Sequence, residues 1–360
     1  MKKILRRRFF GPQSDNRKSK TCAEQRRSIQ NPKWVGIVVI AVAFTLCGAR
    51  ASAQQTGKIF RIGFLDPSNA SGIAALVDAF RQELSKLGWI EGKNIAIEYR
   101  FAESKGDERL KELAADLVRL KVDVIVVSGG PTALAAKGAT TTIPIVTTAS
   151  GDPVAAGLVA SLARPGGNVT GFSTLGTELI GKRLEILKDA IPKLYRVGFL
   201  RPPESGASLN SQLKQLRAAA DALKLKVDEI KTQLDAKSFE SFFKTAKQKQ
   251  VGAIMTQSVR PFFVERKRIV ELAVKHRLPG IYPEKGFVDE GGLMSYGADY
   301  DDLYRRAAVY VDKILKDAKP ADLPVQQPTE FEFVINLKAA KQIGLTIPVR
   351  VLERANQVIK

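Results

Sequence analysis

The stretch VDVIVVSGGPT, residues 122–132, decides the fold class of this chain. Its opening residues are almost all apolar and β-branched, which is typical of a strand buried on both faces of a sheet. Two glycines follow, and then Pro131, a residue well suited to the first turn of a helix. A buried strand that runs directly into a helix is the repeating unit of parallel α/β folds, so the stretch predicts a parallel sheet covered by helices.

The same alternation continues on both sides of this stretch. Strand-like runs separated by amphipathic helical segments occur at residues 59–65, 94–101 and 143–147. The pattern restarts at residues 195–200, where YRVGFL repeats the opening RIGFL, and it continues at residues 225–230, 251–256, 280–282 and 292–296. Two similar halves predict two Rossmann-like lobes with parallel sheets, right-handed crossovers and a cleft between them.

The lobe boundaries follow from the position of this restart. We expect lobe one over residues 54–172, lobe two over residues 173–296, a return to lobe one over residues 297–325, and a C-terminal segment, 326–360, that crosses back to lobe two. The first two crossings are the predicted hinges, because glycine tolerates the backbone rotation that a hinge must absorb. The predicted hinge residues are Gly171, Phe172, Ser173, Tyr296 and Gly297.

The N-terminal segment, residues 1–53, differs from the rest of the chain. It is rich in lysine and arginine, continues into the apolar run VGIVVIAVAFTLC at residues 35–47, and ends in Ala51-Ser52-Ala53. A basic start, a short apolar run and an A-x-A cleavage site predict a signal peptide, with the mature protein starting at Gln54 in the periplasm. The apolar run is too short to span a membrane. Cys47 is not preceded by the small residues of a lipid-attachment motif, so we expect no stable membrane anchor.

Charge and composition exclude several classes of function. Half of the formal net charge of +20 lies in residues 1–53, and the remaining excess is spread along the chain without basic runs interleaved with aromatics. We therefore expect no nucleic-acid partner. One histidine, His276, and two cysteines, both within the predicted signal peptide, leave no basis for a transition-metal site or a Cys/His nucleophile. The motifs G-x-G-x-x-G and G-x-x-x-x-G-K-[ST] are absent, so we expect no cofactor and no enzyme.

Candidate ligand-binding residues lie in the loops that follow the predicted strands, because ligands of open parallel sheets bind at the carboxyl ends of the strands. The candidates in lobe one are Ser68, Asn69, Ser128, Gly129, Gly130, Thr132, Thr148, Ser150 and Asp152. The amino end of a helix beginning near Pro131 would favour a ligand carboxylate at residues 128–132.

Each of these loops also has a plain structural interpretation. Ser128 would then be a helix cap, Ser68 and Asn69 would cap a helix that begins at Gly72, and Asp152 followed by Pro153 would be a helix cap rather than a partner for a ligand ammonium group.

The candidates in lobe two are Arg201, Gln257, Ser258, Tyr282 and Glu284. The ring of Tyr282 could stack on an apolar ligand, with Glu284 near the amino group of that ligand. The alternatives are that Glu284 lies in a surface loop and that Tyr282 packs at the edge of the core.

Longer ordered strings carry a family resemblance. They are GWIEGKN at residues 88–94, DPVAAGLVASLARPGGNVTG at 152–171, GGLMSYG at 291–297 and DLPVQQPTEFEFVINLKAAKQIGLTIP at 322–348. With these strings the chain resembles the periplasmic ABC transporter substrate-binding proteins, in the group that includes tryptophan- and tyrosine-binding members. The resemblance implies a type I periplasmic-binding-protein fold, like the leucine and ribose receptors.

The resemblance also implies a function. A small organic ligand, an amino acid or a related compound, would be closed between the lobes and delivered to the permease and ATPase subunits of an importer, by a protein that we expect to be a monomer. Two alternatives remain open: a ligand-sensing protein that serves a chemoreceptor or sensor kinase, and an exported α/β enzyme.

Overall fold

The computed structural model describes residues 58–203 and 207–360, and Gly57–Lys360 form one compact unit. The predicted signal peptide lies outside the described residues. Within the described part of the chain, every helix is either too short or too polar to cross a membrane.

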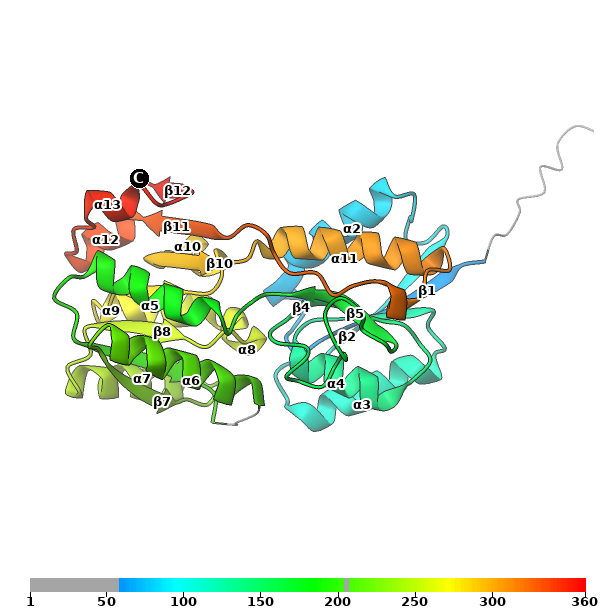
Figure 1. The fold of residues 1–360 in the computed structure, drawn as a ribbon, viewed down its shortest axis with the longest axis horizontal. Helices are drawn as coiled ribbons and strands as arrows, with labels where there is room; N and C mark the ends of the chain where they lie inside the picture. The colour runs from blue at the N-terminus through cyan, green and yellow to red at the C-terminus, as the bar shows by residue number, and fades with distance from the viewer. Residues whose placement is uncertain (1–57, 204–206) are drawn as a thin grey trace, which may run out of the picture. The chain divides into compact units, whose positions relative to one another are not determined.

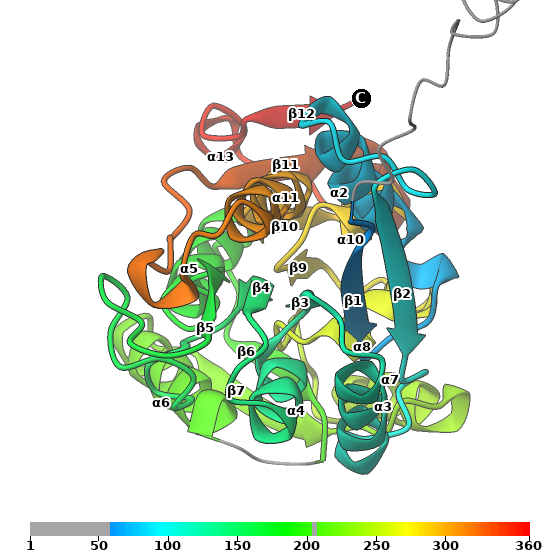
Figure 2. The same cartoon turned by 90° about the vertical axis from the view of Figure 1, so that its right-hand side faces the viewer.

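The first sheet is parallel throughout and has the strand order β2-β1-β3-β4-β5. Its strands are β1 (Phe60–Asp66), β2 (Ile95–Phe101), β3 (Val124–Val127), β4 (Ile145–Ser150) and β5 (Val169–Ser173). A short 3-10 helix, η1 (Ser71–Ile73), precedes the helices α2 (Ala74–Lys86), α3 (Asp107–Arg119) and α4 (Gly130–Ala139). Helices α3 and α4 pack together on one face of this sheet, and α2 lies on the other (Figure 2).

The second sheet has the order β12-β11-β10-β9-β8-β6-β7. Its strands are β6 (Arg196–Arg201), β7 (Lys226–Lys231), β8 (Ala253–Thr256), β9 (Gly280–Tyr282), β10 (Met294–Gly297), β11 (Glu332–Asn336) and β12 (Gln357–Ile359). Its helices are α5 (Leu179–Ala190), α6 (Ala207–Ala222), α7 (Ala236–Gln248), α8 (Arg260–Val264), α9 (Arg266–Lys275), α10 (Gly286–Asp289), α12 (Leu337–Ile343) and α13 (Val349–Leu352).

Two strands of this sheet, β11 and β12, depart from the predicted parallel arrangement, because β12 is parallel to the reversed strand β11. Strand β11 runs antiparallel to β10, while the other neighbouring pairs are parallel. The reason is the path of the chain: β10 leads toward lobe one, and β11 enters the sheet on the way back from it (Figure 1).

The chain crosses between the lobes three times. The connections run from β5 to α5, from β10 to α11 (Tyr300–Leu315), and from the segment after η2 (Pro320–Asp322) to β11. Helix α11 packs on α2 and against β3, β4 and β5, so it completes lobe one (Figure 1). A bridge between Phe172 and Gln326 ties the third connection to β5.

Gly171 is the middle residue of β5 and Gly297 is the last residue of β10, and these two strands lead into the first two connections. A Cβ on Gly171 would lie 2.1 Å from the carbonyl oxygen of Thr147, and a Cβ on Gly297 would lie 1.9 Å from that of Pro283. Both glycines are therefore required by the close approach of a neighbouring backbone. This steric reason differs from the conformational freedom on which their predicted hinge role was based.

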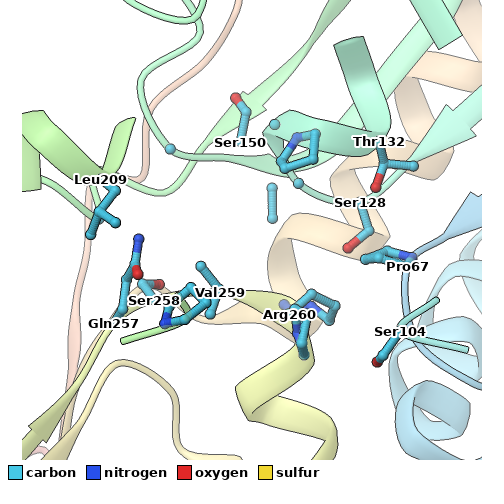
Figure 3. A pocket seen from close by; sticks show the side chains of 18 of the residues that line it. Pro67, Ser104, Ser128, Thr132, Ser150, Leu209, Gln257, Ser258, Val259 and Arg260 are labelled. Atoms are coloured by element: carbon cyan, nitrogen blue, oxygen red, sulfur yellow. The ribbon is translucent and has the colours of Figure 1, made fainter. Parts of the chain in front are cut away.

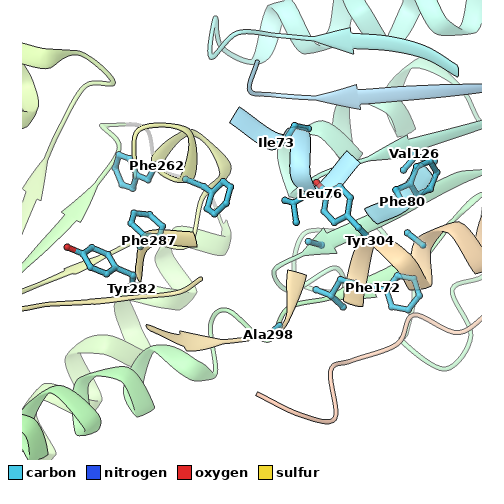
Figure 4. Packing of buried hydrophobic residues seen from close by; sticks show 14 of the residues in the cluster. Ile73, Leu76, Phe80, Val126, Phe172, Phe262, Tyr282, Phe287, Ala298 and Tyr304 are labelled. Carbon is cyan, nitrogen blue, oxygen red and sulfur yellow. The ribbon is translucent and has the colours of Figure 1, made fainter. Parts of the chain in front are cut away.

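Three groups of buried apolar side chains make up the core. One lies under α3 and α4 in lobe one, and one lies between the second sheet and α5 and α6 in lobe two. The third contains residues of both lobes, including Ile73 and Leu76 from lobe one and Phe262 and Phe263 from lobe two (Figure 4). The lobes are thus in contact where η1 meets α8.

Candidate functional site

A cavity of about 780 Å³ lies at the carboxyl ends of the strands of both sheets. Lobe one contributes the loops after β1, β2, β3 and β4, and lobe two contributes the loops after β6, β7, β8 and β9. Thr174 and Gly176, in the first connection between the lobes, complete the wall. The volume is in the range of small-molecule sites, and walls from two lobes are typical of a site that closes around its ligand.

The loop before α4 and the first turn of that helix contain four predicted residues that lie together at the cavity. Ser128, Gly129, Gly130 and Thr132 all line the cavity (Figure 3). The N-cap of α4 is Gly129, whose φ of 87° favours glycine, and no side chain caps the helix. The hydroxyls of Ser128 and Thr132 are buried and have no hydrogen-bond partner among the described residues. Two buried polar groups therefore remain available to a ligand at the start of this helix.

Ser150 and Asp152 also line the cavity, but their side chains already have partners. The Ser150 hydroxyl donates to the carbonyl oxygen of Phe172 over 3.1 Å. Oδ1 of Asp152 accepts from the backbone amides of Val154 and Ala155, at 3.1 Å and 2.9 Å. The capping interpretation of Asp152 is therefore the geometry observed.

Three other lobe-one candidates lie outside the lining of the cavity: Ser68, Asn69 and Thr148. Oδ1 of Asn69 accepts from the backbone amide of Gly72 over 2.7 Å, which is the capping interaction. Ser68 is fully buried, and its hydroxyl and its amide both donate to the carboxylate of Asp66. Thr148 is fully buried in β4.

In lobe two the cavity is lined by Gln257, Ser258 and Glu284, whereas Arg201 and Tyr282 are not part of the lining. Arg201 turns toward Glu229, with 3.5 Å between Nε and the carboxylate. The ring of Tyr282 is almost fully buried and stacks on Phe287, with 4.6 Å between ring centroids. The structure thus places Tyr282 in the core, outside the lining of the cavity.

Sequence reasoning missed Arg260, the first residue of α8, which lines the cavity. Nη1 of Arg260 lies 3.1 Å from Oε2 of Glu284, and both side chains are more than 90% buried. The guanidinium also lies over the rings of Phe263 and Tyr300, 4.6 Å and 4.8 Å from their centroids. Burial is the largest single effect and would lower the pKa of Arg260, but Glu284, Tyr304, Tyr300 and Asp66 together outweigh it and hold the pKa above its usual value. Arg260 is therefore a fixed positive charge at the cavity.

Sequence reasoning also missed Asp66, the last residue of β1, which lies behind the lining of the cavity rather than in it. Its side chain is fully buried; Oδ1 accepts from Ser68, while Oδ2 has no hydrogen-bond partner among the described residues. Burial raises the pKa of Asp66 above its usual value, although Arg260 and the hydrogen bonds from Ser68 oppose that rise. Since Arg260 belongs to lobe two, charges of the two lobes interact across the site.

Aliphatic side chains lie at the opposite end of the cavity, close to the polar Gln257 and Ser258 (Figure 3). In Figure 3, Leu209 lies across the cavity from Arg260 and Ser128. The aliphatic and proline side chains in the lining include Leu158, Pro202, Pro203, Leu209, Leu234 and Val259. The site therefore combines a charged end with an aliphatic end, an arrangement suited to a small molecule with a charged head and an apolar body.

A family model described as ABC transporter substrate binding protein matches residues 62–359, which is nearly the whole described chain. The chain belongs to this family. A substrate-binding protein of this kind is a receptor for a solute, and the two-lobed α/β architecture is that of type I periplasmic binding proteins.

Among individual relatives, the tyrosine-binding protein of Clostridioides difficile (strain R20291) is 28% identical to this chain over 278 residues, covering 74% of this chain and 75% of the relative. Two solved structures each match 84% of this substrate-binding protein and all of their own chain. An ABC domain from Streptococcus pneumonia in complex with L-Trp is 26% identical, with a TM-score of 0.75. A ligand-free, open substrate-binding protein with adhesive properties from Clostridium difficile is 27% identical, with a TM-score of 0.60.

Proposed function

We propose that this protein is an extracytoplasmic receptor that captures an amino acid or a closely related compound between its lobes and delivers it to the permease and ATPase of an ABC importer. The observation that carries the proposal is the cavity between the two sets of strand ends, with a charged end and an aliphatic end. An amino acid has the same division, since its ammonium and carboxylate groups lie at one end and its side chain at the other.

The relatives support this ligand class. One curated relative is a tyrosine-binding protein, and one solved structure holds L-Trp. The lining of the present cavity is mainly aliphatic and proline at its apolar end, so the side chain of the ligand need not be aromatic here. The proposed ligand class is therefore amino acids in general.

Capture by closure of the lobes is the second part of the proposal. At equal coverage and nearly equal identity, the structure matches the L-Trp complex better than the ligand-free, open relative. This difference supports a closed arrangement of the two lobes in the present structure. A ligand can shift the equilibrium toward that arrangement only by binding it more tightly than the open one, and a cavity with walls from both lobes supplies such a difference.

Export is the third part of the proposal, because an importer receives its solute outside the cytoplasm. It rests on the signal-peptide pattern of residues 1–53. Mass spectrometry of the protein from the periplasm should find an N-terminal peptide that starts at Gln54. A lipid-modified Cys47 in that preparation would contradict cleavage after Ala53.

Thermal-shift screening of the purified protein against the standard amino acids tests the ligand class. A ligand that binds only the folded protein stabilises it by RT ln(1 + [L]/Kd), about 2.7 kcal/mol at roughly 100 times Kd. We expect at least one amino acid to raise the melting temperature, and calorimetry should confirm one molecule bound per chain. Failure of all of them, or conversion of a bound compound into a product, would overturn the proposal.

A further inference from the structure

We propose that the ligand lies across the cavity in one orientation, with its ammonium group at Ser128 of lobe one, next to the buried carboxylate of Asp66 behind the lining, and its carboxylate at Arg260 of lobe two. This inference rests on the proposed function, because it assumes a ligand that carries both groups. It assigns the two charged positions of the site to residues in different lobes, and it reverses the expectation that the carboxylate lies at residues 128–132.

The first step concerns Asp66. This carboxylate is fully buried at the end of β1, and its Oδ2 has no hydrogen-bond partner among the described residues. A buried charge without a partner is unfavourable, and a cation that arrives with the ligand would compensate it. A carboxylate brought to the same place would add a second buried negative charge, which like-charge repulsion opposes.

The second step concerns Ser128, which lies between Asp66 and the cavity. Its hydroxyl is close enough to the carboxylate to lower the pKa of Asp66, although the two groups are not in the geometry of a formed hydrogen bond. A hydroxyl has one hydrogen to donate and two lone pairs that accept. When the hydrogen is donated to Asp66, the lone pairs remain to accept a hydrogen bond, and an ammonium group of the ligand can donate one.

The amino end of α4 favours a ligand carboxylate at Ser128, whereas Asp66 favours an ammonium group there. The sizes of the two charges decide which effect is larger. A helix terminus carries roughly half of a positive charge, shared among backbone amides. Asp66 carries a full negative charge in a site from which water is excluded. The local field at Ser128 is therefore negative whenever Asp66 is ionised.

The third step concerns Arg260. Among the described residues that line the cavity it is the only lysine or arginine, whereas Asp107, Asp152, Asp235 and Glu284 also line it. Arg260 is held by Glu284 on one side and by the rings of Phe263 and Tyr300. A guanidinium has five N–H donors in a planar arrangement, so Arg260 can bind a carboxylate while it keeps the bond to Glu284.

Two sets of probes test the orientation in the purified protein by calorimetry. One set is L-tyrosine, tyramine and 3-(4-hydroxyphenyl)propanoate, and the other is L-leucine, 3-methylbutylamine and 4-methylpentanoate. Each set contains the amino acid, the amine without its carboxylate and the acid without its ammonium group. Comparison within a set shows which charged group of the ligand each residue recognises.

We expect Asp66→Asn to weaken binding of the amino acid and the amine by tenfold or more, and to leave binding of the acid unchanged or tighter. The double variant Arg260→Gln/Glu284→Gln, which leaves neither partner charged, should weaken the amino acid and the acid but spare the amine. Asp78→Asn is the matched control, because Asp78 is an exposed carboxylate of lobe one outside the lining of the cavity. Circular dichroism establishes that each variant is folded.

The possible outcomes separate the two proposals. If amino acids bind but the pattern is exchanged between the variants, or if neither variant discriminates amine from acid, the orientation is overturned and the proposed function stands. If either variant fails to fold, Ser128→Ala decides: a loss of affinity for the amino acid and the amine but not the acid supports the orientation, and a loss for the amino acid and the acid but not the amine overturns it. If no member of either set binds, the orientation falls, and the screen of the remaining amino acids decides the proposed function.

Discussion

Arg266 of lobe two donates a hydrogen bond from Nη1 to the backbone carbonyl oxygen of Gly72 in lobe one, over 3.2 Å. The same guanidinium pairs with Glu290 at 3.2 Å and lies 4.5 Å from the centroid of the Phe263 ring. Because Glu290 and Phe263 belong to lobe two, they hold the arginine in place whether or not lobe one is near. The bond to Gly72 is therefore the contact of Arg266 that depends on how the lobes are arranged.

We expect Arg266→Gln to weaken ligand binding, although Arg266 is not part of the cavity lining. A hydrogen bond of this kind contributes about 0.5–1.5 kcal/mol, so loss of it from the closed form should raise Kd about two- to tenfold. Arg268→Gln is the control, because Arg268 lies on the same helix and pairs with Glu265 at the surface of lobe two. Calorimetry gives Kd, and small-angle scattering without ligand should show a larger radius of gyration for Arg266→Gln. An unchanged Kd would mean that the bond persists in the open form.

Gly171 leads to a prediction about stability. A Cβ at this position would lie 2.1 Å from the carbonyl oxygen of Thr147, and the φ of 128° is itself unfavourable for other residues. Gly171→Ala should therefore lower the free energy of unfolding by more than about 2 kcal/mol. Gly167→Ala, where no atom lies within 4 Å of the added Cβ, should change it by less than about 1 kcal/mol. Urea denaturation measures both, and equal effects would contradict the steric explanation.

The sequence predicts most of the fold because the strands are buried on both faces. Runs such as the four residues of β3 are fully apolar, and only a sheet covered on two sides accommodates them. The direction of β11 was not predictable in the same way. The alternation of a strand indicates which faces are buried, but its direction depends on the side from which the chain enters the sheet.

Residues of the candidate site that lie in loops after strands were predicted from the sequence, whereas charged residues that become buried in the folded protein were missed. Ser128 follows β3 directly and Glu284 is the second residue after β9, so their place at the cavity follows from the topology. Asp66 and Arg260 are charged residues at a strand end and a helix start, positions that normally lie at the surface. Segments distant in the sequence bury them: Ser128 and Tyr304 face Asp66, and Glu284 and Tyr300 lie against Arg260. A local pattern contains no information about such contacts.

Tyr282 leads to a prediction that separates the core from the site. Its ring stacks on Phe287 and is nearly fully buried, so Tyr282→Phe should leave Kd for the ligand unchanged within about twofold. Tyr282→Ala should cost about 3–5 kcal/mol in stability, as expected when a large buried ring is removed. Calorimetry and urea denaturation measure the two quantities. A large loss of affinity in Tyr282→Phe would show that the hydroxyl of this residue contributes to ligand binding.

Asp66 leads to a prediction about pH. The groups that face it are Ser68 in its own loop, Ser128 after β3, Tyr304 on α11 and Arg260 on α8. Burial raises the pKa of Asp66 in the folded protein above its value in the unfolded chain, which is near 3.8. The folded protein therefore holds this proton more tightly, and the contribution of Asp66 to stability falls as the pH rises from about 3.8 through the raised pKa.

The side-chain amide of the Asp66→Asn variant cannot titrate. In the absence of ligand, the free energy of unfolding of the variant minus that of the wild-type protein should therefore increase as the pH rises. Other buried acids, such as Glu284, titrate in both proteins and largely cancel in the difference. Urea denaturation of both proteins between about pH 4 and pH 8 measures this difference, and a difference that is constant with pH would show that Asp66 is ionised throughout. A bound ammonium group favours the ionised carboxylate, so a saturating amino acid should reduce or reverse the increase.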